Sequence, residues 1–237
     1  MPDLAEVTTA ILAGGLGTRL RAVVADRPKV LAEIGGRPVL AYLLDHLADG
    51  GVRDVVLCTG YLGEQVQATF GDSYGRLRLV YSQESSPLGT AGALRLALPL
   101  VKSDSLLVMN GDSFNEVDLR AVWTWHGAQG AEATLLLAEV PDTTRYGRVR
   151  LDADGLVQGF DEKNDTGGPG WINAGMYLLN HRLLATIPAG RAVSLEREMF
   201  PAWISGGLYG YRNNGRFLDI GTPDDYALAE SFFALVN

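Results

Sequence analysis

Residues 8–20 of the chain read TTAILAGGLGTRL, an apolar run followed directly by three glycines within four residues. An apolar run of this length is typical of a strand buried in a sheet. Closely spaced glycines let the backbone approach a ligand and point several N–H groups at an anion. The stretch therefore predicts a strand that ends in an anion-binding loop.

Two common nucleotide-binding loops do not fit this stretch. The dinucleotide fingerprint G-x-G-x-x-G would begin at Gly15 and Gly17, but Leu20 occupies the place of its third glycine. The P-loop needs a lysine directly after its last glycine, and no lysine stands there. An NAD-dependent oxidoreductase is therefore disfavoured, and it stays open as the alternative from another class of enzyme.

Positive charge gathers just beyond the glycines. Arg19, Arg21, Arg27 and Lys29 place four cations within eleven residues, in a chain with a formal net charge of −8. A nucleoside triphosphate carries about four negative charges, and it needs cations or N–H dipoles to compete with water. The loop is thus suited to a polyphosphate, although solvated surface explains Arg21 and Arg27 equally well.

The composition excludes several classes of partner. A net charge of −8 opposes binding to a nucleic-acid backbone, which needs a basic face. No apolar run approaches the ~20 residues that cross a bilayer, and the first residues lack the pattern of a signal peptide. We therefore expect no nucleic acid, no membrane and a cytoplasmic location, and the oligomeric state stays open, a homo-oligomer included. Cys58, the single cysteine, is expected to be a small buried hydrophobe.

Apolar periodicity beyond the loop predicts strands and helices in alternation, which implies parallel βαβ units. In the first half, strands are expected at 54–59, 77–81 and 105–109, and helices from Pro38, at 62–70 and at 91–98. In the second half, strands are expected at 133–140, 171–179, 208–212 and 217–220, with a hairpin of 146–151 and 156–160 and helices from Asp118 and Thr222. This order predicts one α/β domain over residues 1–237, a Rossmann-like three-layer fold with a mixed, mostly parallel central sheet and a β-rich insertion.

The segment LAGGLGTRL at residues 12–20, followed by Pro28-Lys29, resembles the N-terminal signature of the sugar-1-phosphate nucleotidyltransferases. The resemblance implies that Arg19 and Lys29 hold the triphosphate and that Arg19 stabilises the leaving pyrophosphate. It also implies that residues 1–115 form the nucleotide-binding half, that residues 116–237 form the sugar- and metal-binding half, and that the β-rich insertion lies on the sugar side.

The stretch 84–92, ESSPLGTAG, resembles the loop with which this family recognises the base, and Glu84 takes the position that faces the base edge. A carboxylate only accepts hydrogen bonds, and guanine offers two adjacent donors, whereas uracil and thymine would set a carbonyl against it. This favours GTP. The implied nucleotide-binding residues are Leu12, Ala13, Gly14, Gly15, Gly17, Thr18, Glu84, Gly89 and Thr90.

A second set of motifs resembles the metal and sugar positions of the family. Asp112 follows the predicted strand 105–109, and Asp219 lies in the segment FLDIGTP. Two carboxylates with phosphate oxygens and water suit Mg²⁺, the implied cofactor. Lys163 is the implied contact of the sugar phosphate, which makes Arg19, Lys29 and Lys163 the predicted catalytic residues. The implied sugar-binding residues are Asn110, Tyr146, Gly147, Glu162, Asn173 and Gly175. No role follows for His46, His126 or His181, which we expect to be structural or exposed.

The whole run of motifs, including Ser194-Leu195-Glu196, resembles D-glycero-α-D-manno-heptose-1-phosphate guanylyltransferases most closely. Mannose-1-phosphate guanylyltransferases follow, and then uridylyltransferases for other sugar 1-phosphates. We therefore expect GTP and a sugar 1-phosphate as substrates. A non-catalytic regulatory relative of the same fold would tolerate the loss of Arg19, Lys29 or Asp112, and all three are present.

Overall fold

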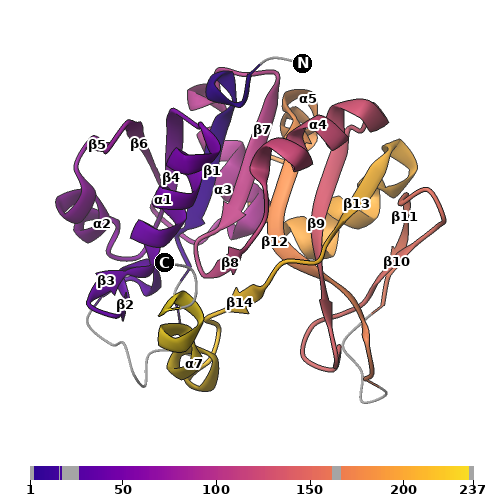
Figure 1. Cartoon of the computed structure of the whole chain (residues 1–237). Helices are drawn as coiled ribbons and strands as arrows, with labels where there is room; N and C mark the ends of the chain where they lie inside the picture. The colour runs from indigo at the N-terminus through magenta and orange to yellow at the C-terminus, as the bar shows by residue number, and fades with distance from the viewer. Residues whose placement is uncertain (1–2, 16, 18–26, 162–166, 235–237) are drawn as a thin grey trace.

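An eight-stranded mixed sheet runs through the molecule in the order β13-β9-β12-β7-β1-β4-β6-β5 (Figure 1). The computed structural model describes residues 3–15, 17, 27–161 and 167–234. Four of the predicted site residues, Thr18, Arg19, Glu162 and Lys163, lie outside these ranges.

The central part of the sheet is parallel, as the alternation of strands and helices predicts. The adjacent strands β6, β4, β1 and β7 all run in one direction. The reversed strand β12 lies between β7 and β9, and β13 is parallel to β9. The strands are β1 (Thr8–Ala13), β4 (Asp54–Thr59), β5 (Ser73–Tyr74), β6 (Leu77–Gln83), β7 (Ser105–Asn110), β9 (Ala133–Val140), β12 (Gly170–Asn180) and β13 (Leu208–Asn213).

Helices cover both faces of the sheet and create two separate apolar cores. One core joins α1, α2, α4 and α7 to the sheet, and the other joins α3, α5 and α6 to its opposite face. Their bounds are α1 (Val39–Gly50), α2 (Gly63–Phe70), α3 (Gly89–Ala97), α4 (Leu119–Gln129), α5 (His181–Thr186), α6 (Phe200–Trp203) and α7 (Pro223–Ala234). The predicted three-layer α/β fold with a mixed, mostly parallel sheet is confirmed. No helix of the described residues is long and apolar enough to span a bilayer.

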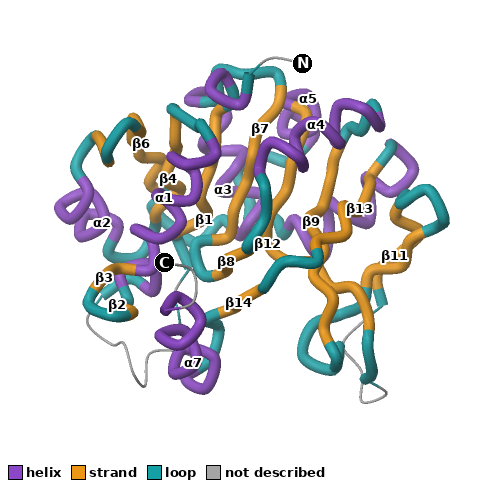
Figure 2. Tube along the Cα trace, in the orientation of Figure 1, coloured by secondary structure: helices purple, strands orange, loops and turns teal. Residues whose placement is uncertain are grey.

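The predicted hairpin is present as β10 (Val149–Leu151) and β11 (Val157–Phe160), two antiparallel strands beside the main sheet (Figure 2). Its turn is closed by Asp152, whose Oδ1 accepts hydrogen bonds from the backbone N–H groups of Asp154 and Leu156 at 3.0 and 2.9 Å. Gly155 has a φ of 88°, which a glycine adopts without strain. The turn chemistry therefore explains why the sequence pattern identified this hairpin.

A further two-stranded sheet contains one strand that the sequence predicts and one that it does not. The predicted last strand is present as β14 (Phe217–Asp219), but its antiparallel partner β8 (Ser113–Asn115) was not predicted. Their register pairs Asp219 with Ser113, the residue that follows Asp112. Because of this pairing, two segments about a hundred residues apart in the sequence meet beside the carboxyl end of β7. The other strands and α-helices missed by the sequence pattern are likewise short: β2 (Glu33–Ile34), β3 (Arg37–Pro38), β5, α5 and α6.

Candidate active site

A cavity of about 270 Å³ opens at the carboxyl edge of the central strands. The ends of β1, β4, β6 and β7 and the start of α3 contribute to its wall. In an open parallel sheet this edge is where ligands bind. The residues that line the cavity are Leu12, Ala13, Gly14, Gly15, Lys29, Val30, Cys58, Glu84, Pro87, Gly89, Thr90, Ala93, Asn110, Gly111 and Asp112. The structure therefore brings together the glycine loop, Glu84 and Asp112, each of which follows a strand of the parallel sheet.

The close approach of β1 and β7 requires a glycine at position 111. The Gly111 N–H donates to the carbonyl of Leu12 at 2.9 Å. A Cβ at this position would lie 2.7 Å from Val30 Cγ1 and 2.8 Å from that carbonyl oxygen, both too close for a real contact. Gly111 thus lets the chain turn tightly and sets Asp112 next to the glycine loop.

Glu84 forms part of the cavity wall, and its carboxylate is held from two sides. Its Oε2 accepts a hydrogen bond from the Leu88 N–H at 3.0 Å, which closes the loop before α3. Its Oε1 faces Gly14 and Gly60, where an added Cβ would lie only 3.1 and 2.9 Å away. Burial raises the pKa of Glu84 above its ordinary value, against the opposing hydrogen bond from Leu88. A preformed acceptor therefore stands in the cavity beside the glycine loop.

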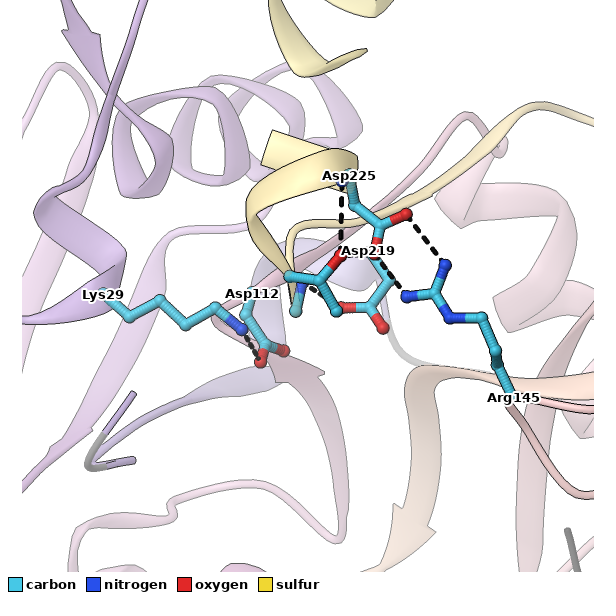
Figure 3. A network of polar contacts seen from close by, with 7 residues as sticks. Lys29, Asp112, Arg145, Asp219 and Asp225 are labelled. Atoms are coloured by element: carbon cyan, nitrogen blue, oxygen red, sulfur yellow. Dashed lines mark hydrogen bonds and ion pairs between the residues drawn. The ribbon is translucent and has the colours of Figure 1, made fainter. Parts of the chain in front are cut away.

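Lys29 and Asp112 form an ion pair in the same cavity, with Nζ 2.6 Å from Oδ2 (Figure 3). Lys29 begins the short 3₁₀ helix Lys29–Leu31, and Asp112 follows β7 after one glycine. The lysine side chain is 12% exposed and the aspartate 37%. A mostly buried ammonium with an open carboxylate beside it is an arrangement suited to an anionic ligand and its counter-ion.

Asp219 lies close to this pair because β14 is paired with β8. The Ile220 N–H donates to the carbonyl of Asp112 at 2.9 Å, and the Gly221 N–H donates to Asp219 Oδ1 at 2.8 Å. Burial raises the pKa of Asp219, and the negative charge of Asp112 raises it further. A buried carboxylate whose ionisation is disfavoured by a neighbouring negative charge forms a place where a divalent cation is stabilised.

Within the described ranges, no group of three or more histidine, cysteine or acidic side chains is arranged to hold a metal ion. Asp112 and Asp219 can supply two oxygen ligands. Mg²⁺ commonly takes one or two carboxylates and completes its shell with substrate phosphates and water. The donor set therefore fits a cation that is bound together with a polyphosphate.

A second ion pair lies on the far side of Asp219, between Arg145 and Asp225 (Figure 3). The guanidinium bonds both oxygens of the carboxylate, with Nη1 to Oδ1 at 3.1 Å, and Thr222 Oγ1 donates to Asp225 Oδ2 at 2.6 Å. Arg145 accordingly lowers the pKa of Asp225. Neither residue is among the site residues predicted from the sequence. Nothing in their spacing indicates a pair, since they lie 80 positions apart.

Three of the predicted sugar-binding residues lie together around Tyr177. Asn173 Nδ2 donates to the Tyr177 hydroxyl at 3.1 Å, and the Gly175 N–H donates to Asn173 Oδ1 at 2.9 Å. Gly175 has a φ of 74°, and a Cβ there would lie 2.7 Å from Asn110 Nδ2. The buried Oδ1 of Asn110 has no hydrogen-bond partner among the described residues. A ligand hydroxyl can supply the missing donor.

Tyr146 and Gly147, two further predicted sugar-binding residues, do not line the cavity. The Tyr146 ring meets Phe217 edge-on at 6.1 Å, beneath the Arg145 guanidinium. Gly147 is needed for packing, because a Cβ there would lie 2.6 Å from the carbonyl of Asp161. Gly17 does not line the cavity but lies near the Lys29 stem, since a Cβ there would be 3.4 Å from Lys29 Cβ. The predicted roles of Tyr146, Gly147 and Gly17 stay predictions.

Five residues of the cavity wall were not predicted to bind ligand: Val30, Cys58, Pro87, Ala93 and Gly111. Cys58 is buried as expected, and burial raises the pKa of its thiol to about 12, so it is a protonated wall residue. Pro87 and Gly111 lie inside motifs whose neighbours were predicted, so motif membership is the signal that could have included them.

The fold and this site define a nucleotidyl transferase: the family model described by that name matches residues 8–234, and the chain belongs to this family. Among its relatives is the D-glycero-alpha-D-manno-heptose 1-phosphate guanylyltransferase of Aneurinibacillus thermoaerophilus, 36% identical over 93% of this chain and 95% of that protein. The mannose-1-phosphate guanylyltransferase of Mycobacterium tuberculosis is also 36% identical, but the chain spans only 63% of its length.

Among solved structures, HddC from Yersinia pseudotuberculosis superimposes with a TM-score of 0.86 at 32% identity, covering 96% of this chain and 99% of that one. The same protein complexed with GMP-PN superimposes with a TM-score of 0.85, also at 32% identity and with the same coverage. The predicted family and fold are therefore confirmed.

Proposed function

We propose that the chain transfers GMP from GTP to a sugar 1-phosphate and releases pyrophosphate, with D-glycero-α-D-manno-heptose 1-phosphate as the first candidate acceptor. The observation that carries this proposal is the set Lys29, Asp112 and Asp219 beside a cavity lined by the glycine loop and Glu84. The heptose relative, covered over 95% of its length, supports this acceptor, and the complex of a structural relative with GMP-PN supports a guanine nucleotide.

The reaction needs no covalent intermediate with the protein. A sugar phosphate has a second pKa near ~6, so at neutral pH it is mostly a dianion that can attack the α-phosphorus directly. The protein's part is then to align the two phosphates and to neutralise their charge. The cavity lining fits such a reaction, because none of His46, His126 and His181 lines the cavity.

Each charged residue of the site has a definite part in this proposal. Lys29, mostly buried at the glycine loop, neutralises the triphosphate. Asp112 and Asp219 would hold Mg²⁺, which supplies Lewis-acid stabilisation of phosphate charge. Arg19, on the departing pyrophosphate, and Lys163, on the sugar phosphate, are parts of the proposal that rest on the sequence motifs, because both lie outside the described residues.

Mannose 1-phosphate is the second candidate acceptor, because mannose-1-phosphate guanylyltransferases match at the same level of identity. The first candidate is preferred because this chain and the heptose relative match over nearly their whole lengths. A regulatory relative without catalysis stays as the non-enzymatic alternative.

A substrate matrix tests the proposal. The purified protein is mixed with Mg²⁺, one of GTP, ATP, UTP, CTP or dTTP, and one of several sugar 1-phosphates, and pyrophosphate release is measured. We expect the highest rate for GTP with the heptose 1-phosphate, and loss of that rate in Asp112→Asn. A highest rate with mannose 1-phosphate would correct the acceptor, and no release in any well would support the regulatory alternative.

A further inference from the structure

The start of α3 forms one wall of the cavity, through Gly89, Thr90 and Ala93. A segment from the second half of the chain holds this wall in place. The carbonyl of Val193 accepts from the N–H groups of Ala91 and Gly92 at 3.0 and 3.2 Å, and the Val193 N–H donates to the carbonyl of Leu88 at 2.8 Å. These bonds satisfy N–H groups of the first helical turn, which has no side-chain cap.

The backbone contact leaves no room for a side chain at position 89. Gly89 has a φ of 71°, and a Cβ there would lie 2.6 Å from the Val193 carbonyl oxygen. The segment around Val193 is therefore packed directly against the cavity wall. The Val193 backbone therefore fixes the position of the wall directly, because no side chain lies between them at Gly89.

Side chains extend this contact through Glu196. Thr90 Oγ1 donates to Glu196 Oε2 at 2.8 Å, and Ser194 Oγ donates to the same oxygen at 2.8 Å. The Leu195 N–H in turn donates to Thr90 Oγ1, also at 2.8 Å. The single hydroxyl proton of Thr90 is thus directed at Glu196 and away from the cavity. Hydrogen bonds to a charged acceptor are stronger than neutral ones, so this contact fixes the Thr90 rotamer.

Glu196 also lies near the group around Tyr177. Tyr177 is fully buried, and its pKa is raised mainly by burial and next by the negative charge of Glu196. The hydroxyl of Tyr177 accepts from Asn173, one of the predicted sugar-binding residues. Glu196 therefore bonds the wall of the cavity through Thr90 and lies near the sugar-side group around Tyr177, although it does not itself line the cavity.

We propose that Glu196 is a positioning residue, which sets the wall of the nucleotide cavity by holding the Thr90 hydroxyl. The proposal rests on the proposed function, because it takes the cavity to be the nucleotide site. Glu196 shapes the site to which the nucleotide binds and does not line the cavity itself. Its loss therefore weakens nucleotide binding and leaves the rate of the bound complex nearly unchanged.

The test compares Glu196→Gln with the wild type by calorimetric titration with GTP and by steady-state kinetics. We expect the Kd and the KM for GTP to rise about tenfold, as for loss of one charge-assisted hydrogen bond, with kcat changed by less than about threefold. Glu230→Gln, at an exposed glutamate of α7, is the matched control and is expected to leave Kd, KM and kcat unchanged.

Two variants of Thr90 keep the test valid if Glu196→Gln does not fold. Thr90→Val preserves the shape but removes the hydroxyl, and it is expected to weaken GTP binding about as much as Glu196→Gln. Thr90→Ser keeps the hydroxyl and is expected to lie closer to the wild type than Thr90→Val. In the double variant Thr90→Val with Glu196→Gln, the loss is expected to be no larger than in the worse single variant, since both remove the same contact.

The outcomes separate this inference from the proposed function. If the wild type binds and uses GTP but Glu196→Gln leaves its Kd unchanged, or lowers kcat alone, Glu196 does not position the wall. Additive losses in the double variant would also overturn the pairing with Thr90. If the wild type neither binds GTP nor releases pyrophosphate, the proposed function fails first and the inference falls with it.

Discussion

At the scale of single residues, Glu84 is the side chain on which base choice is expected to depend. Its Oε2 accepts from the Leu88 N–H and its Oε1 is packed against Gly14 and Gly60, and a carboxylate has no donor to offer a uracil carbonyl. We predict that GTP exceeds UTP and dTTP by at least about tenfold in kcat/KM, which corresponds to roughly 1.4 kcal/mol.

Glu84→Gln tests that assignment, because an amide can serve either base edge. The ratio of kcat/KM for GTP over UTP is expected to shrink towards one, mainly through improved use of UTP. Gln83→Glu, one position earlier on β6, is the control and is expected to leave the ratio in place. A ratio that is unchanged in Glu84→Gln would move the discrimination to backbone groups near Gly89.

Asp219 is predicted to lower the stability of the folded protein while it contributes to catalysis. Because burial and Asp112 raise its pKa above the ordinary 3.8, ionised Asp219 is disfavoured in the folded state. Asp219→Asn removes that charge, and its amide oxygen can still accept from Gly221. We expect kcat to fall by about a hundredfold or more, while the Tm at neutral pH rises by about 2–4 °C if the charge costs about 1 kcal/mol.

The pH dependence of this gain has a definite sign. In the unfolded chain Asp219 ionises near its ordinary pKa, and in the folded protein it ionises at a higher pH. The gain of Asp219→Asn over the wild type is therefore absent below about pH 3.8 and grows until the raised pKa is passed. Thermal unfolding at several pH values measures it. A variant that is less stable than the wild type at pH 7 would show that Asp219 stabilises the fold.

At the scale of elements, much of the secondary structure could be predicted and the pairings between distant elements could not. Local signals that tertiary packing does not override are present in the apolar runs of β1, β4 and β7, at the capping Asp118 of α4 and in the turn after Leu151. The strand β8 has only three residues, and it exists because β14 pairs with it. No local pattern encodes such a pairing.

The same distinction separates the predicted from the unpredicted parts of the site. The glycine loop, Glu84 and Asp112 follow parallel strands, so their convergence could be predicted from the sheet edge. The meeting of Asp112 with Asp219 came from the family resemblance alone, because it depends on β8 and β14. The contact of Asp225 with Arg145 joins positions 80 apart, and that of Glu196 with Thr90 joins positions 106 apart. Neither contact could be predicted from the spacing of residues in the sequence.

The pair of Arg145 and Asp225 is expected to hold the turn between β14 and α7, which directly follows Asp219. Arg145→Lys keeps the charge but loses the two-point geometry. We expect the Mg²⁺ concentration for half-maximal activity to rise by up to about tenfold, with a loss of stability below about 1 kcal/mol because the arginine is half exposed. Arg216→Lys, at the exposed pair with Glu116, is the control. An unchanged magnesium requirement in Arg145→Lys would show that the pair does not support Asp219.

At the scale of the whole molecule, buried histidines are expected to make the fold acid-sensitive. His126 is 4% exposed, bonds Thr134 through Nδ1 at 2.8 Å and stacks on Trp123. Burial lowers its pKa to about 4 from an ordinary value of 6.5. Between these values the unfolded chain binds a proton that the folded protein does not, so stability falls as the pH falls from about 6.5 to about 4.

His126→Gln removes this titration. The slope of unfolding free energy against pH between 6.5 and 4 is expected to decrease by up to about 1.4 kcal/mol per pH unit relative to the wild type. Urea unfolding at pH 4.5, 5.5 and 6.5 measures the slope. His181→Gln, at the half-buried first residue of α5, is the control. Equal slopes in the wild type and His126→Gln would assign acid sensitivity to other groups.

The central claim is that this site joins a guanylyl group to a sugar phosphate, and product analysis under competition tests it most directly. The protein is given equimolar GTP and UTP, Mg²⁺ and D-glycero-α-D-manno-heptose 1-phosphate, and nucleotide sugars and pyrophosphate are quantified by mass spectrometry and enzymatic assay. We predict GDP-heptose in at least about tenfold excess over UDP-heptose, one pyrophosphate per GDP-heptose, and neither product with Asp112→Asn. UDP-heptose in equal amount, or pyrophosphate without a nucleotide sugar, would contradict the account.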